Sequence, residues 1–291
     1  MILPGSYANG FAPRDGMPLY PALWRGCVGA WAPCLGPTGL TLRDNSRFGN
    51  HGTLTNMDAG ADWVTDAGRY ALDFDGTNDE VLIGANTLLR FTHVQPFTLS
   101  AWFRPDNVAN LAPIGYTTTT NSAGYYLSWT RDAVSDIPAN CVNCDYYNGT
   151  AFQGRISTAG SVVAGQLVHV AMTRDGSGTQ TGHRVYLNGI NLPNARASVA
   201  ATLTASIDYS SAFFAIGRRY RTTPVYADMT FVESMVHGRE LNSAEIQLLA
   251  SRRGIAYELA PRRRSRVSVL ASMRYNIFTG NVGSLEVIGA S

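Results

Sequence analysis

Residues 70–84, YALDFDGTNDEVLIG, contain the pattern that decides the fold of this 291-residue chain. Leu72 and Phe74 alternate with aspartates, as they do where successive side chains of a β-strand point to opposite faces. Gly76 then begins a turn, and the apolar run EVLI starts a return strand. The stretch therefore predicts a β-hairpin in which Asp73 is a solvated strand residue rather than part of a catalytic carboxylate cluster.

The composition of the whole chain also favours β-structure. Only 15% of the residues are charged, whereas glycine occurs 29 times, and this balance suits short strands joined by turns. Alternation of apolar and polar residues recurs in FTLSAWFRP, YYLSWT, LVHVAMTRDG, HRVYLNGI and SAFFAIGRR. Because this spacing continues from about residue 25 to about residue 237 without a linker, we expect one all-β domain, an antiparallel jelly-roll sandwich.

One short helix is predicted after the last strand. In LNSAEIQLLASRRG, Asn242 is a good N-cap, Glu245 completes a capping box three residues later, and Gly254 ends the helix. We expect its apolar stripe to seal one edge of the sandwich.

The predicted organisation is a sandwich domain over residues 23–258 between an extended N-terminal arm, residues 1–22, and a basic C-terminal arm, residues 259–291. The N-terminal arm has no basic region followed by a long apolar stretch, so we predict neither a signal peptide nor a membrane span. The arm residues expected to bind partners are Tyr7, Phe11, Arg262, Arg263, Arg264 and Arg266.

Several motifs follow one another in a recognisable order. DNSRFGNHGT (residues 44–53) comes first, and ALDFDGTNDEVLI, FTLSAWFRP, LVHVAMTRDGSG, RVYLNG and FFAIGRR follow it. This order resembles the laminin-G-like jelly rolls of the concanavalin A-like lectin and glucanase superfamily, over about residues 25–250. The resemblance implies a concanavalin A-like sandwich.

The resemblance also implies a calcium site as the one candidate cofactor site, because related sandwiches hold such an ion with carboxylate, carbonyl and amide oxygens of rim loops. The motif positions that could supply these ligands are Asp44, Asn50, Asp75 and Asp79. Turn and cap hydrogen bonds are the alternative role for the same side chains. The family's late Ile-Asp-Glu-Val segment reads FVES here, with Val232 in place of the aspartate and only Glu233 kept.

Aromatic side chains gather in two segments, YYLSWT and CDYYNGTAF. Exposed aromatic faces stack on sugar rings while Asn and Asp orient the hydroxyl groups. The candidate glycan-binding residues are Tyr125, Tyr126, Trp129, Tyr146 and Tyr147. Alternation along a strand places half of such residues in the core, so packing is the alternative for each of them.

Catalytic signatures are missing from the sequence. Laminarinase-type relatives carry Glu-x-Asp-x-x-Glu on one strand, because a retaining mechanism needs two carboxylates about 5 Å apart. The nearest segment, ELNSAE (residues 240–245), has Asn242 at the centre and begins the predicted helix, where capping explains its glutamates. His169 in LVHVAM matches a structural histidine of the family. We therefore predict that the protein is not an enzyme.

Two classes of function fit these features. The first is a structural and recognition protein of a bacteriophage virion, a capsid decoration or fibre- or tail-associated protein, made in the host cytoplasm. Its partners would be other virion subunits, copies of itself and surface glycans, and MRYNIFTG resembles short segments of phage tail- and fibre-related proteins. The alternative is a cellular carbohydrate-binding protein or a degenerate glycoside hydrolase. A net charge of only +2 does not favour nucleic acid as a partner, and we expect no membrane partner.

Overall fold

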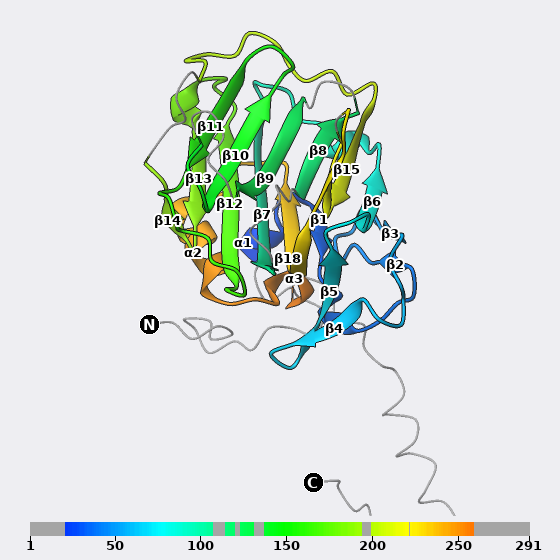
Figure 1. Cartoon of the computed structure of the whole chain (residues 1–291). Coiled ribbons are helices and arrows are strands. Elements are labelled where there is room, and N and C mark those ends of the chain that lie inside the picture. The colour runs from blue at the N-terminus through cyan, green and yellow to red at the C-terminus, as the bar shows by residue number, and fades with distance from the viewer. Residues whose placement is uncertain are drawn as a thin grey trace, which may run out of the picture. The chain divides into compact units, whose positions relative to one another are not determined.

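The computed structural model describes residues 21–106, 114–119, 123–130, 137–193, 199–220 and 222–258. All of these lie within one unit of the chain, residues 18–260. They build two large antiparallel sheets that pack face to face (Figure 1), so the predicted all-β sandwich is confirmed. The arm residues predicted to bind partners lie outside the described residues. Among the described residues, no helix is long and apolar enough to cross a membrane.

The first sheet has the strand order β14-β13-β12-β7-β18-β5-β4, and β1 lies beside the second half of β18. Its strands are β1 (Cys27–Trp31), β4 (Trp63–Asp66), β5 (Arg69–Asp75), β7 (Pro96–Pro105), β12 (Val168–Asp175), β13 (His183–Leu187), β14 (Ile190–Asn191) and β18 (Asp228–His237). The long strands β7 and β18 pair along most of their length and form the centre of this sheet.

The second sheet has the order β11-β10-β9-β8-β15-β6-β3-β2. Its strands are β2 (Thr41–Leu42), β3 (Gly52–Thr55), β6 (Glu80–Gly84), β8 (Ile114–Thr118), β9 (Gly124–Thr130), β10 (Cys141–Tyr147), β11 (Phe152–Ile156) and β15 (Ala212–Ile216). A separate ribbon pairs β16 (Arg218–Arg219) with β17 (Val225–Tyr226). Aromatic side chains fill the space between the sheets: Phe103 of β7 stacks on Trp129 of β9 with ring centroids 4.7 Å apart.

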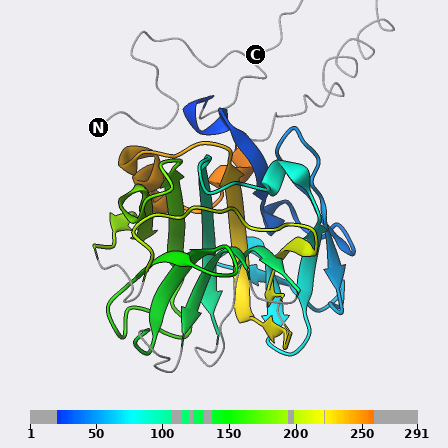
Figure 2. The same cartoon turned by 90° about the horizontal axis from the view of Figure 1, so that it is seen from above.

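Short helices lie on the outer side of the first sheet, where Figure 2 shows them in blue and orange beside one layer. The helices are α1 (Pro21–Trp24), α2 (Ser243–Ser251) and α3 (Ile255–Glu258), and the 3-10 turns are η1 (Pro33–Leu35), η2 (Thr87–Leu89) and η3 (Gln180–Gly182). The predicted capping box of α2 is confirmed, since Asn242 and Glu245 each accept a hydrogen bond from the other's backbone amide at 3.0 Å.

The helix α2 ends at Ser251, before the predicted Gly254. Its buried Leu249 packs in a second, smaller core that includes Ala171 of β12 and Tyr186 of β13. It therefore covers the outer face of the first sheet, and the prediction that it seals an edge is wrong. The reason is that β12 and β13 carry apolar side chains on both faces, so their outer face also needs a cover.

The alternating segment YALDFD, residues 70–75, lies in β5 as predicted. Leu72 and Phe74 are buried in the core, and Asp73 is exposed on the opposite face. The predicted hairpin is wrong, because β5 pairs with β4 and β18 of the first sheet, whereas β6 pairs with β3 and β15 of the second. The turn carries the chain across the sandwich, so that Phe74 and Val81 enter the same core from opposite layers.

Candidate functional site

The aromatic side chains predicted to bind glycans do not form an exposed surface. Tyr125, Trp129 and Tyr146 are 0% exposed and belong to the core between the sheets. Tyr147 is half-buried, and its hydroxyl donates to the carbonyl of Gly149 at 2.7 Å. The exposed position predicted for the three core rings is wrong, because alternation along β9 and β10 turns them toward the first sheet.

Tyr126 has the opposite orientation and points to the outer face of the second sheet. Its hydroxyl donates to Asp145 Oδ2 at 3.2 Å and accepts a hydrogen bond from Arg219 Nη2 at 2.6 Å. The guanidinium carbon of Arg219 lies 4.0 Å from the centroid of the Tyr126 ring, which is a cation–π contact. The ring face expected to stack on a sugar therefore holds an arginine instead.

The turn after β15 places this arginine. Gly217 has a φ of +88°, and a Cβ at this position would lie 2.3 Å from the Phe74 ring. Only glycine meets both conditions, so the chain can leave β15 at this point and continue as β16 next to β8. Arg219 then reaches β9 on one side, while Arg218 reaches β6 on the other.

Arg218 is held by a carboxylate and by aromatic rings. Its Nη1 is 2.9 Å from Glu80 Oε1, and Glu80 is only 3% exposed. Its guanidinium lies 4.1 Å from the centroid of the Tyr220 ring. The Tyr220 hydroxyl donates to Glu80 Oε2 at 2.8 Å, and burial, together with this hydrogen bond, raises the pKa of Tyr220. Tyr220 is therefore a neutral donor at ordinary pH.

These contacts join one set of side chains, which we call the outer polar cluster. It consists of Glu80, Thr117, Tyr126, Asn143, Asp145, Arg218, Arg219 and Tyr220. Within it, Asn143 is 2% exposed and donates to Asp145 Oδ2 at 3.1 Å. The Oδ1 atom of Asn143 is buried without a hydrogen-bond partner, which is uncommon in folded proteins.

Of the outer polar cluster, only Tyr126 was predicted from the sequence as a site residue. Alternation along YYLSWT and CVNCDYY places Tyr126 and Asp145 on one face only after the two strands are paired, and the structure pairs them directly opposite each other. Arg218 and Arg219 follow a predicted strand, and Gly217 before them permits a turn. The sequence does not show that this turn leads back over the sheet.

The candidate calcium ligands occur as two hydrogen-bonded pairs. Asp44, which is 6% exposed, accepts from the amides of Ala30, Ser46 and Asn50, each at 2.8 Å. Asp79 accepts from the amide of Asp75 at 3.1 Å. Within the part of the chain that the structure describes, no group of three or more His, Cys, Asp or Glu is arranged to hold a metal. The carboxylates of Asp44 and Asp79 therefore accept hydrogen bonds within loops and turns, which was the alternative to calcium binding. Calcium binding stays a prediction.

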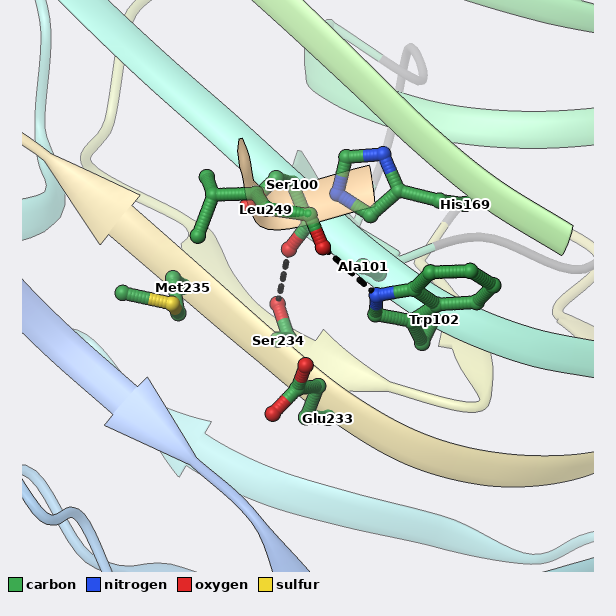
Figure 3. Close-up of a pocket in the computed structure, with 8 residues that line it drawn as sticks. All are labelled: Ser100, Ala101, Trp102, His169, Glu233, Ser234, Met235 and Leu249. Carbon is green, nitrogen blue, oxygen red and sulfur yellow. Dashed lines mark hydrogen bonds between the residues drawn. The ribbon is translucent and has the colours of Figure 1, made fainter. Parts of the chain in front are cut away.

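A small cavity lies under α2 on the outer face of the first sheet (Figure 3), and its space suits about one water molecule. It is lined by Ser100, Ala101, Trp102, His169, Glu233, Ser234, Met235 and Leu249. Trp102 Nε1 donates to the Leu249 carbonyl at 3.0 Å, and burial lowers the pKa of His169 to about 3, so this histidine is neutral. Glu233 accepts from the amides of Gly254 and Ala256 and thereby fastens α3. These contacts fit structural roles.

The glutamates of ELNSAE are also engaged in structural contacts. Glu240 forms an ion pair with Arg184 of β13. Glu245 completes the cap of α2 and pairs with Arg239 at 2.7 Å, and these contacts lower the pKa of Glu245. The two side chains therefore act in the fastening of α2 and its preceding loop.

A model of the concanavalin A-like lectin/glucanases superfamily, of the Laminin_G_3 type, matches residues 75–247, more than half of the chain. The chain belongs to this superfamily. The match includes every member of the outer polar cluster. No curated protein matches the chain in sequence.

Solved structures of this superfamily's fold are similar to the chain at low sequence identity. The Trypanosoma rangeli sialidase in complex with sialic acid has 17% identity and a TM-score of 0.53 over 82% of this chain, which spans 34% of that enzyme. Domain 4 of AbnA, a GH43 extracellular arabinanase from Geobacillus stearothermophilus, in complex with arabinotriose, has 15% identity and a TM-score of 0.52, and the match covers 77% of this chain and 98% of that domain. The binding domain of botulinum neurotoxin serotype G has 16% identity and a TM-score of 0.50, over 77% of this chain and 50% of that one. These likenesses show the fold.

Proposed function

We propose that the protein is a non-catalytic recognition module that binds a glycan at the outer polar cluster. The observation that carries this proposal is the arrangement of Arg218 and Arg219, which are partly exposed and fixed on tyrosine rings above buried hydrogen-bonding groups. Sites for sugars combine such fixed polar groups with aromatic support.

The similar structures support the proposal at the level of the fold. The arabinanase domain, nearly all of which is covered by this chain, is in complex with arabinotriose. The absence of catalysis is supported by the engagement of the carboxylates: Glu80 is paired with Arg218, Glu240 with Arg184, and Glu245 with Arg239. A retaining glycosidase would instead need two carboxylates that face one substrate bond.

A glycan array probed with the full chain tests the proposal. We expect a defined set of glycans to bind, and binding to fall at least tenfold in Asn143→Ala. The variant lacks the buried amide that holds Asp145 and, through Tyr126, the position of Arg219, and the lost hydrogen bond is worth about 1–3 kcal/mol. Arg47→Ala, at an exposed arginine over Phe48, is the control and should bind normally. Thermal melting of each variant separates loss of binding from loss of the fold. An array without a bound glycan, or normal binding by folded Asn143→Ala, would overturn the proposal.

We further propose that the module works on a bacteriophage particle, as a capsid decoration or a fibre- or tail-associated protein. The support comes from the sequence: apolar anchors such as Tyr7 and Phe11 precede the sandwich, and the arginine run 262–266 follows it. Such segments can lie across neighbouring subunits, with arginines pairing to carboxylates in a bidentate manner. The alternative is a cellular carbohydrate-binding protein or a degenerate glycoside hydrolase. In that case the neighbouring genes would encode enzymes and transporters for polysaccharides rather than capsid or tail proteins.

Deletion of either arm tests the particle assignment. We expect the deleted protein to remain folded but to be incorporated weakly into virions. Neutralising only the arginine run should cause a loss that is largest at low salt, because salt screens the ion pairs that the unaltered run makes. Particles with normal amounts of an arm-deleted protein would contradict the assignment.

A further inference from the structure

Arg219 is a partly buried cation that forms no direct ion pair with a carboxylate among the described residues. Among the described residues, its hydrogen-bond partner is the Tyr126 hydroxyl, at 2.6 Å, and no ion pair joins it to an acid. Its Nε atom is buried and has no hydrogen-bond partner. A buried or half-buried guanidinium is normally paired, because removing its charge from water has a cost that an anion offsets. Arg219 therefore lacks the partner that its position calls for.

Several other partly buried arginines of the sandwich have that partner. Arg218 pairs with Glu80, Arg104 and Arg253 both pair with Asp66, and Arg239 pairs with Glu245. These pairs use the carboxylates that lie near each guanidinium, so the molecule satisfies its arginines where it can.

Arg90 and Arg155 are also partly buried and have no ion pair among the described residues, but the Nε atom of each donates a hydrogen bond, to the Tyr116 hydroxyl and to the His183 carbonyl. Arg174 has no ion pair among the described residues either, and it differs in access. It is 2% exposed, lies on β12 against the Tyr146 ring, and donates to Gln153 Oε1 at 2.9 Å. The core encloses it, so no ligand of the size of a sugar reaches it. Arg219 combines the missing anion with partial exposure.

The surroundings of Arg219 fix its orientation before a ligand arrives. The guanidinium carbon of Arg219 lies 4.0 Å from the centroid of the Tyr126 ring, and the Tyr126 hydroxyl accepts a hydrogen bond from Nη2. The same hydroxyl donates to Asp145, which also accepts from Asn143. This chain of hydrogen bonds fixes the guanidinium through Tyr126 and Asp145, while the group itself stays partly exposed. A guanidinium held in this way is complementary to a carboxylate on a ligand.

We infer that the glycan bound at the outer polar cluster is an acidic sugar, whose carboxylate pairs with Arg219. This inference rests on the proposed function and adds the chemical class of the ligand. An arginine and a carboxylate form a charge-assisted, often bidentate pair, which gives both affinity and orientation. Tyr126 acts here as a positioning residue, because it holds the guanidinium without contacting the sugar.

The test uses matched pairs of glycans that differ in the carboxylate. The full chain is titrated by calorimetry with trigalacturonate against galactotriose and with sialyllactose against lactose, after the array has screened a wider set of acidic and neutral sugars. We expect acidic members to bind and their neutral counterparts to bind at least tenfold more weakly. Arg219→Gln should reduce affinity for the acidic glycan by about tenfold to a hundredfold, as expected for loss of a charged hydrogen bond.

Three variants make the result specific. Arg219→Lys keeps the charge but lacks the planar fork, so it should restore part of the affinity. Tyr126→Phe should weaken acidic binding more than neutral binding, because it removes the group that holds Nη2. Arg47→Gln makes the same charge change at an exposed site and should leave the affinity unchanged. Melting curves confirm that each variant is folded.

The outcomes separate this inference from the proposed function. Equal binding of acidic and neutral glycans, or unchanged acidic affinity in folded Arg219→Gln, would overturn the acidic-ligand inference while glycan binding itself stands. An array in which no glycan binds would overturn the proposed function, and the inference with it.

Discussion

Asp44→Ala gives the sharpest test of how the loop 44–50 is held. In the folded chain the Asp44 carboxylate accepts from the amides of Ala30, Ser46 and Asn50 at 2.8 Å, and from the Ser46 hydroxyl at 2.6 Å. The side chain is nearly buried, and the alanine variant leaves these amides without an acceptor. Each buried donor left unsatisfied costs about 1–3 kcal/mol.

The expected loss in the free energy of unfolding is about 3–5 kcal/mol, since three backbone donors each lose a charged acceptor and water reaches only the rim of the loop. For a domain of this size, 1 kcal/mol corresponds to roughly 2–4 °C in melting temperature, so a drop of roughly 6–20 °C is expected. Urea unfolding should show a lower midpoint at an unchanged slope, which indicates a stability change without a change in the denatured state.

Asp75→Ala is the matched control. The Asp75 side chain is exposed and accepts from the amides of Thr77 and Asn78 at the surface, where water replaces it, so we expect a loss below about 1 kcal/mol. A similar small loss for Asp44→Ala would refute the hydrogen-bond reasoning. If instead millimolar calcium raises the melting temperature of the wild type but not of the Asp44 variant, the predicted calcium site is supported and the ion shares the stabilising role.

The remaining predictions concern pH and one glycine. Burial lowers the pKa of His237 to about 4, below its unfolded value near 6.5, so protonation favours the unfolded chain as the pH falls. We expect His237 to lower the free energy of unfolding by about 1–2 kcal/mol between pH 7 and pH 5, as measured by urea titrations. The free energy of unfolding of His237→Gln should depend less on pH, and the same pH dependence in both proteins would count against this role of His237. Asp79 has the opposite sign: burial, with nearby carboxylates, raises its pKa to about 6, so the charged form destabilises the fold above that pH. Asp79→Asn should therefore raise the urea midpoint at pH 7 but not at pH 4, and a gain at both would contradict the assignment. Gly217→Ala should lower stability by about 2–4 kcal/mol, through left-handed strain and the clash with Phe74, and should weaken ligand binding; an unchanged melting curve would show that the Phe74 ring yields.

The local pattern of the chain was sufficient for several of its strands and for its main helix. Leu72 and Phe74 alternate with aspartates, and this period of two depends only on pleat geometry, so β5 could be predicted from the residues alone. The capping box of Asn242 and Glu245 is equally local, since both hydrogen bonds form within one helical turn. The family assignment rests on the order of such local motifs.

The same local pattern could not show which sheet each strand joins. Nothing between Asp75 and Glu80 distinguishes a hairpin from a turn that crosses the sandwich, because that choice depends on where distant strands β15 and β18 lie. The prediction of an exposed aromatic surface failed for a related reason. Alternation says that Tyr125 and Tyr126 face opposite ways, but only the position of the first sheet decides which of them is in the core.

The candidate site depends most strongly on the tertiary structure. Arg218 and Arg219 are neighbours in sequence, yet one is neutralised by Glu80, which lies far from it along the chain, and the other lies on Tyr126 without an anion. Electrostatic pairing acts through space, so a sequence shows how many charges a chain has but not which remain unmatched. The residues by themselves determined a sandwich with few charges and an arginine pair after a strand. The packing of β6, β9 and β16 alone decided which of the two arginines pairs with Glu80 and which lies on Tyr126.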